Sequence, residues 1–175
     1  VTSARWTAVW GPTYAITAVG QLVPVPWIVP SDQIEWFVAA GTSAVGLAWV
    51  LRESAEVVEA GPAFAAREGD VCALIAEGEA LLSRGAAHQA GVRAWHAHGI
   101  NLVVNLAIGI ALAVGYDKAI AGAVNVAIGA VLGEVTILTA PRRLVSAWAE
   151  YQRGEVPDAE GVSLSVGPGG LVLRF

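Results

Sequence analysis

The chain lacks methionine, has a single cysteine and carries few charges. Charged residues make up 14% of its 175 residues and hydrophobic residues 55%, whereas about a quarter of an ordinary soluble domain is charged. The lone Cys72 excludes an intrachain disulfide. A net charge of −5 argues against a nucleic-acid partner, which calls for a basic surface. Because the sequence begins at Val1, we expect a processed start, with a cleaved export signal as one cause.

Motifs of enzymatic chemistry are also absent. The sequence contains no GxSxG elbow, Walker motif, dinucleotide fingerprint or CxxC pair. His96 and His98 are two positions apart and so do not share a helical face, and neither they nor His88 belong to a cluster with zinc-ligand spacing. The sequence therefore predicts no enzyme, no cofactor and no metal site.

The most informative feature that is present is a repeated segment. Val-Asn-Leu-Ala-Ile-Gly at 104–109 returns as Val-Asn-Val-Ala-Ile-Gly at 124–129. The copies lie in two apolar runs, 94–116 and 119–141, which meet at Asp117 and Lys118. Each run exceeds the roughly 20 residues that a helix needs to cross a bilayer. Residues 94–141 therefore predict a transmembrane helical hairpin, with the lipid bilayer as its environment.

Small and amide side chains mark the faces through which these helices pack. Glycine lets helix backbones approach closely, and an amide in hydrocarbon needs a polar partner on a facing helix. Gly129 and Gly133 form a GxxxG motif. These faces predict helix packing within the chain or between copies in a homo-oligomer or larger membrane complex, with a polar pore lining as the alternative. The packing candidates are Asn101, Asn105, Gly109, Gly122, Asn125, Gly129 and Gly133.

Glu134 is the one charged residue within the second apolar run. If the turn lies at Asp117 and Lys118, Glu134 faces Asn101 and lies one turn from His98, so we expect an intramembrane polar pair of Glu134 with His98. A small-residue hairpin with a carboxylate in its second helix resembles the rotor subunits of rotary ATPases. That resemblance implies proton or ion transport, although the carboxylate lies nearer the helix end here and the dense glycine repeat of their first helix is missing.

Residues 1–52 hold two further hydrophobic segments. The uncharged stretch between Arg5 and Asp32 contains four prolines, and proline kinks or ends a helix. We expect either a span over roughly 10–23 with an irregular exit or a re-entrant segment. The segment 36–51 is short for a span, so it is either a short membrane helix or a helix buried in an assembly.

The remaining parts are polar. Within 53–93, Asp70 can cap an amphipathic helix over 71–84 that ends at Arg84 and Gly85. We expect this helix to pack on the bundle, with the lipid surface as the alternative. Residues 142–175 predict a polar linker and a short β-hairpin about the Gly/Pro turn at 167–170. A terminal Phe175 after a short strand resembles the closing strand of bacterial outer-membrane barrels over about a dozen residues.

The fold class expected is therefore an all-α membrane protein with a transmembrane hairpin, two further hydrophobic helices, one amphipathic helix and a C-terminal β-hairpin. The predicted function is a structural subunit of a bacterial membrane assembly. The alternatives are an ion- or proton-conducting oligomer that uses Glu134 and an accessory subunit that anchors a partner through 53–93. Arginines flank the open end of the hairpin, which favours a multi-pass protein of the inner membrane with four spans and cytoplasmic termini. Export or association with the outer membrane is the alternative.

Overall fold

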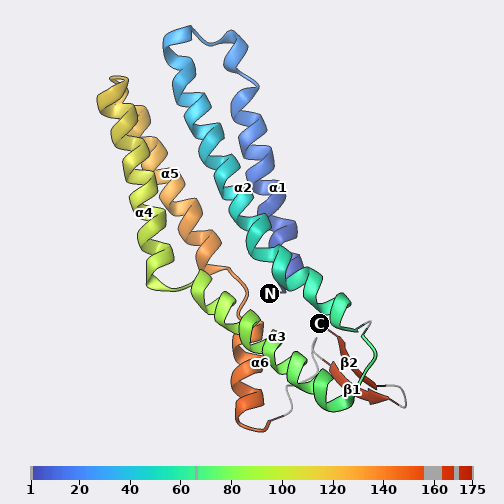
Figure 1. Ribbon diagram of the computed structural model, residues 1–175. Helices are drawn as coiled ribbons and strands as arrows, with labels where there is room; N and C mark the ends of the chain where they lie inside the picture. Colours follow the sequence, from blue (N-terminus) through green and yellow to red (C-terminus); the bar gives the residue numbers. More distant parts are fainter. Residues whose placement is uncertain (1, 66, 156–162, 168–169, 175) are drawn as a thin grey trace.

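The structure, a computed structural model, is built from two long helical hairpins that stand side by side (Figure 1). It describes residues 2–65, 67–155, 163–167 and 170–174, with side chains up to residue 155 apart from 54–63 and 65. One hairpin is α1 (Ser3–Leu22) with α2 (Pro30–Ala65), and the other is α4 (Trp95–Ile110) with α5 (Ala119–Leu138). Below one end lie α3 (Val71–Val92) and α6 (Arg143–Gln152).

The first helix begins earlier and runs straighter than its prolines predict. Its first turn is capped by Thr2, whose hydroxyl accepts a hydrogen bond of 3.3 Å from the backbone N–H of Arg5. Pro12 lies inside the helix and removes one backbone donor without ending it. The expected start near residue 10 is therefore wrong. The prolines end α1 only where they cluster, at the 3₁₀ turn Val25–Trp27 and at Pro30, the first residue of α2.

The second helix is 36 residues long, so the prediction that this hydrophobic helix ends at residue 51 is wrong. Arg52 and Glu53 change the chemistry of the helix surface but do not stop the helix, because both residues are good helix formers. At about 1.5 Å per residue, α2 extends over about 54 Å. It therefore continues well beyond the roughly 30 Å of a hydrocarbon core.

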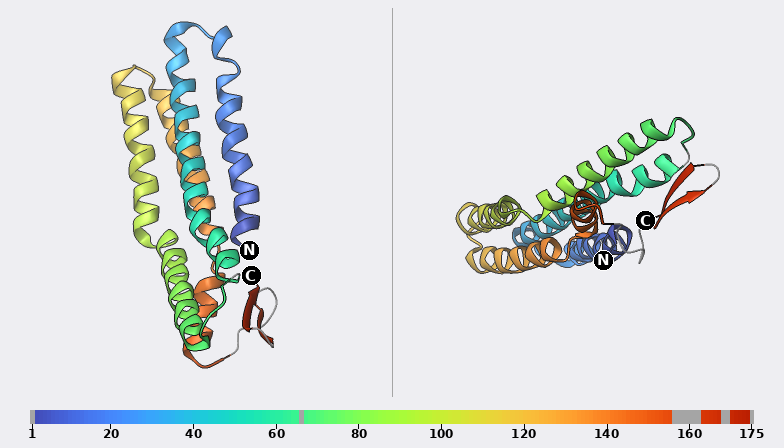
Figure 2. Two further views of the ribbon diagram at one scale, coloured as in Figure 1. Left: turned by 45° about the vertical axis from the view of Figure 1, so that its right-hand side comes forward. Right: turned by 90° about the horizontal axis from the view of Figure 1, so that it is seen from below.

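The turn between α4 and α5 lies at Tyr116–Lys118. Helix α4 passes into a π-helical turn, Ala111–Gly115, and Asp117 then takes a φ of 57°, a left-handed conformation that Asp tolerates better than most residues. The backbone N–H of Lys118 donates to the carbonyl of Leu112 at 2.9 Å. This hydrogen bond and the left-handed Asp117 reverse the chain sharply. Helix α5 therefore returns alongside α4 over its whole length (Figures 1 and 2).

Helix α3 continues to Val92, so the prediction that it ends at Arg84 is wrong. Gly85 serves as a contact point and not as a helix stop, because a Cβ atom there would lie 2.7 Å from Cδ1 of Leu144 on α6. Leu144 and Ala147 are buried, so α6 packs its apolar stripe against α3. This helix lies within the region expected to be a polar linker.

A short antiparallel ribbon follows α6. Strand β1 (Ser163–Gly167) pairs with β2 (Gly170–Arg174), with Ser165 opposite Val172. The turn residues 168–169 and Phe175, which the sequence analysis singled out, lie outside the described residues.

In the described part of the chain, three helical stretches are long and apolar enough to cross a membrane: Pro30–Glu53, Trp95–Gly115 and a window within Ala119–Gln152. The chain is thus helical and consistent with a multi-pass membrane protein. Of the four expected spans, α1 does not meet these limits, since its Thr, Tyr, Gly, Pro and Gln residues lower its apolarity. Large apolar side chains on the hairpins point outward, among them Val114 at 82% exposed and Val103 at 65%, as lipid-facing surfaces do.

Candidate functional site

Four polar side chains form a continuous chain of hydrogen bonds between α4 and α5. Glu134 accepts a hydrogen bond of 2.9 Å from the amide of Asn101, and its second oxygen lies 2.5 Å from Nδ1 of His98. The amide of Asn105 donates in turn to the backbone and side-chain oxygens of Asn101 at 2.8 and 3.0 Å. The His98 and Glu134 side chains remain about one-third exposed, at 34% and 37%. The structure thus brings Glu134 and His98 together at the edge of the hairpin.

The glycines of α5 make room for these amides. A Cβ atom on Gly129 would overlap the side-chain oxygen of Asn105, and one on Gly133 would overlap that of Asn101. The amide of Asn101 also donates to the backbone carbonyl of Ala130 at 3.0 Å. The GxxxG motif therefore serves a contact within one chain, in which each glycine receives an asparagine side chain.

Nearer the turn, Gly109 and Gly122 bring the two backbones into direct contact. A Cβ atom on Gly109 would lie 2.9 Å from the carbonyl oxygen of Gly122 and would overlap a methyl group of Val126. Such approach requires the absence of side chains on both helices. Six of the seven predicted packing residues are thus used inside the α4–α5 hairpin, and Asn125 is the exception.

A set of aromatic side chains on α1 fastens the two hairpins together at their lower end. The indole N–H of Trp6 donates to the backbone carbonyl of Thr136 at 3.3 Å, and that of Trp10 donates to Oγ1 of Thr139 at 2.9 Å. The hydroxyl of Tyr14 lies 3.0 Å from Oγ1 of Thr136, a fully buried residue. We call these contacts the lower clamp.

Arg93, at the junction of α3 and α4, reinforces the lower clamp. Its guanidinium group donates to the carbonyls of Leu138 and Ala140 at 2.5 and 3.0 Å. These carbonyls lie at the C-terminal end of α5, where backbone carbonyls have no N–H partner within the helix. A positive charge there also complements the helix dipole.

A second contact, the upper clamp, joins the tips of the hairpins. The ammonium group of Lys118 pairs with Asp32 and lies 3.3 Å from Oε1 of Glu35. The hydrogen bond with Asp32 and the nearby carboxylate of Glu35 raise the pKa of Lys118. Both carboxylates belong to the first turns of α2, so the upper clamp connects the α4–α5 turn to the other hairpin.

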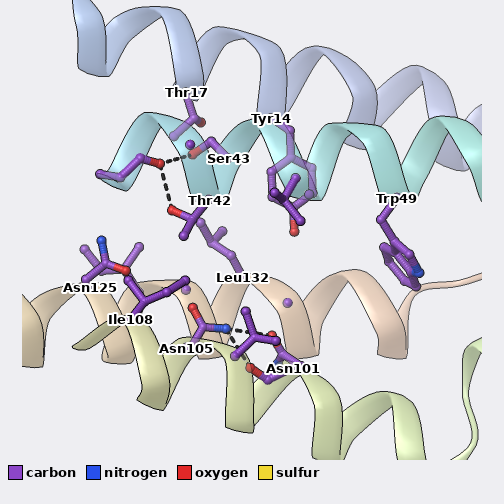
Figure 3. Close-up of a pocket in the computed structure, with 18 of the residues that line it drawn as sticks. Tyr14, Thr17, Thr42, Ser43, Trp49, Asn101, Asn105, Ile108, Asn125 and Leu132 are labelled. Atoms are coloured by element: carbon purple, nitrogen blue, oxygen red, sulfur yellow. Dashed lines mark hydrogen bonds between the residues drawn. The ribbon is translucent and has the colours of Figure 1, made fainter. Parts of the chain in front are cut away.

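Between the two clamps the hairpins border an open cleft of about 1320 Å³. Figure 3 shows its two walls, with Tyr14, Thr17, Thr42 and Ser43 on the α1–α2 side and Asn101, Asn105 and Asn125 on the α4–α5 side. The rest of the lining is largely apolar. It includes Val38, Val45, Val104, Ile108, Ile120, Val124, Ile128 and Leu132.

Asn125 holds an unusual place in this cleft. Within the described part of the chain its amide has no hydrogen-bond partner, although Asn105 and Ser43 on the same walls do. An amide without a partner in hydrocarbon is unfavourable by several kcal/mol relative to water. The cleft therefore offers an unused hydrogen-bonding group to whatever occupies it.

The lower end of the cleft carries charge. Arg52 is exposed and forms no ion pair with any residue that the structure describes, and His96 is exposed nearby on the first turn of α4. Oε2 of Glu53 lies 2.6 Å from Nε2 of His88, so this carboxylate is directed at the imidazole and not at Arg52. No group of three metal-ligating side chains occurs among the described residues.

The sequence does not predict the lower clamp, and it does not predict that Arg52 lines the cleft. One pattern points to the clamp, because Trp6, Trp10 and Tyr14 recur every four residues and so share one face of α1. That face was interpreted as part of an interrupted hydrophobic span. The partners, Thr136 and Thr139, occupy one face of α5 that the sequence does not distinguish from its lipid-facing sides.

Comparison with protein families, with curated protein sequences and with solved structures finds no match to this chain. Any function must therefore be argued from its own geometry.

Proposed function

We propose that this chain is a structural subunit of a larger membrane assembly. The observation that carries the proposal is that each hairpin is packed internally while the two hairpins are joined at the upper and lower clamps, leaving wide apolar surfaces between and around them. In the proposed assembly, neighbouring protein subunits or lipids cover these apolar surfaces.

Self-association would need surfaces other than the glycine faces, which are filled by asparagines of the same chain. The outward face of the α4–α5 hairpin is available, since Val103, Ile110 and Val131 are 60–65% exposed and lie outside the cleft lining. A photo-crosslinking residue at position 131 should give a discrete adduct of higher mass in native membranes. The matched control is position 84 on the polar α3. Adducts with lipid alone at position 131 would contradict the proposal.

Proton or ion transport is the second candidate, and the hydrogen-bonded chain from Glu134 through Asn101 to Asn105 favours it. The Glu134→Gln variant keeps the shape of the side chain and removes its ionisable group. In purified protein reconstituted into vesicles, a structural subunit should assemble as before with no change in ion flux. Loss of a measurable flux in this variant would favour the transport function over the structural one.

The proposed location is the inner membrane, in the orientation that the arginines favour. All nine arginines lie at the lower end of the hairpins or beyond it, while Asp32, Glu35, Asp117 and Lys118 lie at the upper tips. Arginine and lysine are enriched on the cytoplasmic side of membrane proteins. The lower end, with α3 and α6, is accordingly proposed to be cytoplasmic.

A further inference from the structure

The cleft lies between the helices that are apolar enough to span a membrane. Its walls belong mainly to α2, α4 and α5, which contain the three stretches apolar enough to span a bilayer. Its middle is bounded by valine, isoleucine and leucine side chains, and its two ends lie at the two ends of these stretches. Several lining side chains, among them Val45, Val124 and Ile128, are also exposed. The cleft is therefore open to its surroundings, which are acyl chains where these stretches span a bilayer.

The size of the cleft favours a long occupant. Its volume of about 1320 Å³ exceeds the roughly 300–1,000 Å³ typical of pockets for small ligands. An extended molecule with an acyl chain suits a space of this size, which runs along the helices between the two clamps.

The two ends of the cleft differ in charge. At the upper end the cation Lys118 is already paired with two carboxylates, Asp32 and Glu35. At the lower end Arg52 has no such partner in the described structure, and the nearby carboxylate of Glu53 lies against His88. The lower end therefore complements an anionic group at the membrane surface, as basic pockets between membrane helices do.

We propose that the cleft is a binding site for an anionic phospholipid. Its phosphate lies at the lower end against Arg52 and His96, and an acyl chain extends upward between α2 and the α4–α5 hairpin. This inference concerns one site and does not depend on whether the chain is a structural subunit.

Native mass spectrometry of the detergent-purified protein, titrated with phosphatidylglycerol or with phosphatidylcholine of the same acyl chains, tests the headgroup. We expect the anionic lipid to bind about fivefold more tightly, and Arg52→Gln to remove that preference. Arg84→Gln is the matched control, because Arg84 is exposed on α3 and, among the described residues, bonds the carbonyl of Ala80 on its own helix. Equal affinity of the two lipids for the unmodified chain would overturn the proposal.

A second pair of variants tests the place of the acyl chain. Ala121 lines the cleft, whereas Val131 faces outward on the same helix. Ala121→Trp should abolish binding of both lipids, while Val131→Trp should leave it intact, with unchanged thermal midpoints showing that both variants fold. Binding that persists in Ala121→Trp would place the lipid elsewhere. Displacement of phosphatidylglycerol by glycerol phosphate alone would show a site for a soluble phosphate and overturn the lipid assignment.

Discussion

The hydroxyl of Tyr14 on α1 and Oγ1 of Thr136 on α5 lie 3.0 Å apart, although 122 positions separate them in the sequence. Thr136 is fully buried and Tyr14 is 8% exposed. Thr136 also donates to the carbonyl of Leu132 at 2.7 Å, so its oxygen remains free to accept from the tyrosine. This contact connects the two hairpins at the centre of the lower clamp.

Removal of the tyrosine hydroxyl should therefore weaken the clamp. Tyr14→Phe is expected to lower the free energy of unfolding by about 1 kcal/mol, and Thr136→Val by a similar amount. The double variant should lose less unfolding free energy than the two single variants together, because the two changes remove the same hydrogen bond. Thermal or denaturant unfolding in detergent measures these values, with Thr13→Val as control since that hydroxyl bonds only its own helix at Val9. Strict additivity would mean that the two hydroxyls do not interact.

Asn105 packs so closely against Gly129 that even a methyl group at position 129 should destabilise the protein. Gly129→Ala should destabilise the protein by about 1–3 kcal/mol, because the added methyl group overlaps the asparagine oxygen. Gly99→Ala, in open space on α4, should be neutral or stabilising by up to about 1 kcal/mol. Unfolding midpoints in the same detergent compare the two. Equal effects in both variants would show that α4 and α5 do not pack at this register.

The contribution of the upper clamp to stability should fall at high pH. The pKa of Lys118 is raised above its ordinary value of 10.5 by Asp32 and Glu35, so its stabilising effect is fully present below pH 10.5 and is lost as the pH rises through the higher, folded-state pKa. The difference in unfolding free energy between the native chain and Lys118→Gln should be constant at neutral pH and shrink above 10.5. A difference that stays constant across this range would show that the ammonium charge does not contribute.

Orientation in the membrane can be read by chemical labelling. In a Cys72→Ser background, single cysteines at 117 and 155 lie at opposite ends of the hairpins. An impermeant maleimide applied to intact cells should label position 117 and spare position 155, since the arginine-rich end is proposed to be cytoplasmic. The reverse pattern would invert the proposed orientation and favour the exported alternative. Labelling of both in lysed cells is the control for reactivity.

The register of the α4–α5 hairpin could be predicted because it follows from local rules. Once the turn is placed at Asp117, antiparallel geometry alone puts Glu134 opposite Asn101, with His98 one turn away. The structure places all three in contact. Such a prediction needs only the helix rise and the position of one turn.

The cleft could not be predicted, because it depends on the distance between two hairpins that are not neighbours in sequence. The stripe of Trp6, Trp10 and Tyr14 marks one face of α1, but nothing in the sequence indicates that this face meets Thr136 and not lipid, since both are apolar surroundings. The extension of α3 beyond Arg84 to Val92 could not be predicted either, because it depends on packing against a helix distant in the sequence. Gly85 is typical of a helix end in the sequence, and only the structure shows that it faces Leu144 on α6, whose Cδ1 lies 2.7 Å from the place a Cβ atom would take.

The bonds between the beginning of the chain and its fifth long helix have a consequence for biosynthesis. The indole of Trp6 bonds to Thr136, 130 residues later, and α1 is not apolar enough to be among the stretches that span a bilayer by composition. During synthesis the first helix emerges well before its partner and meets only α2 at first. Its final docking must await completion of α5, so α1 is synthesised before α5 but reaches its native position only after α5 has been made.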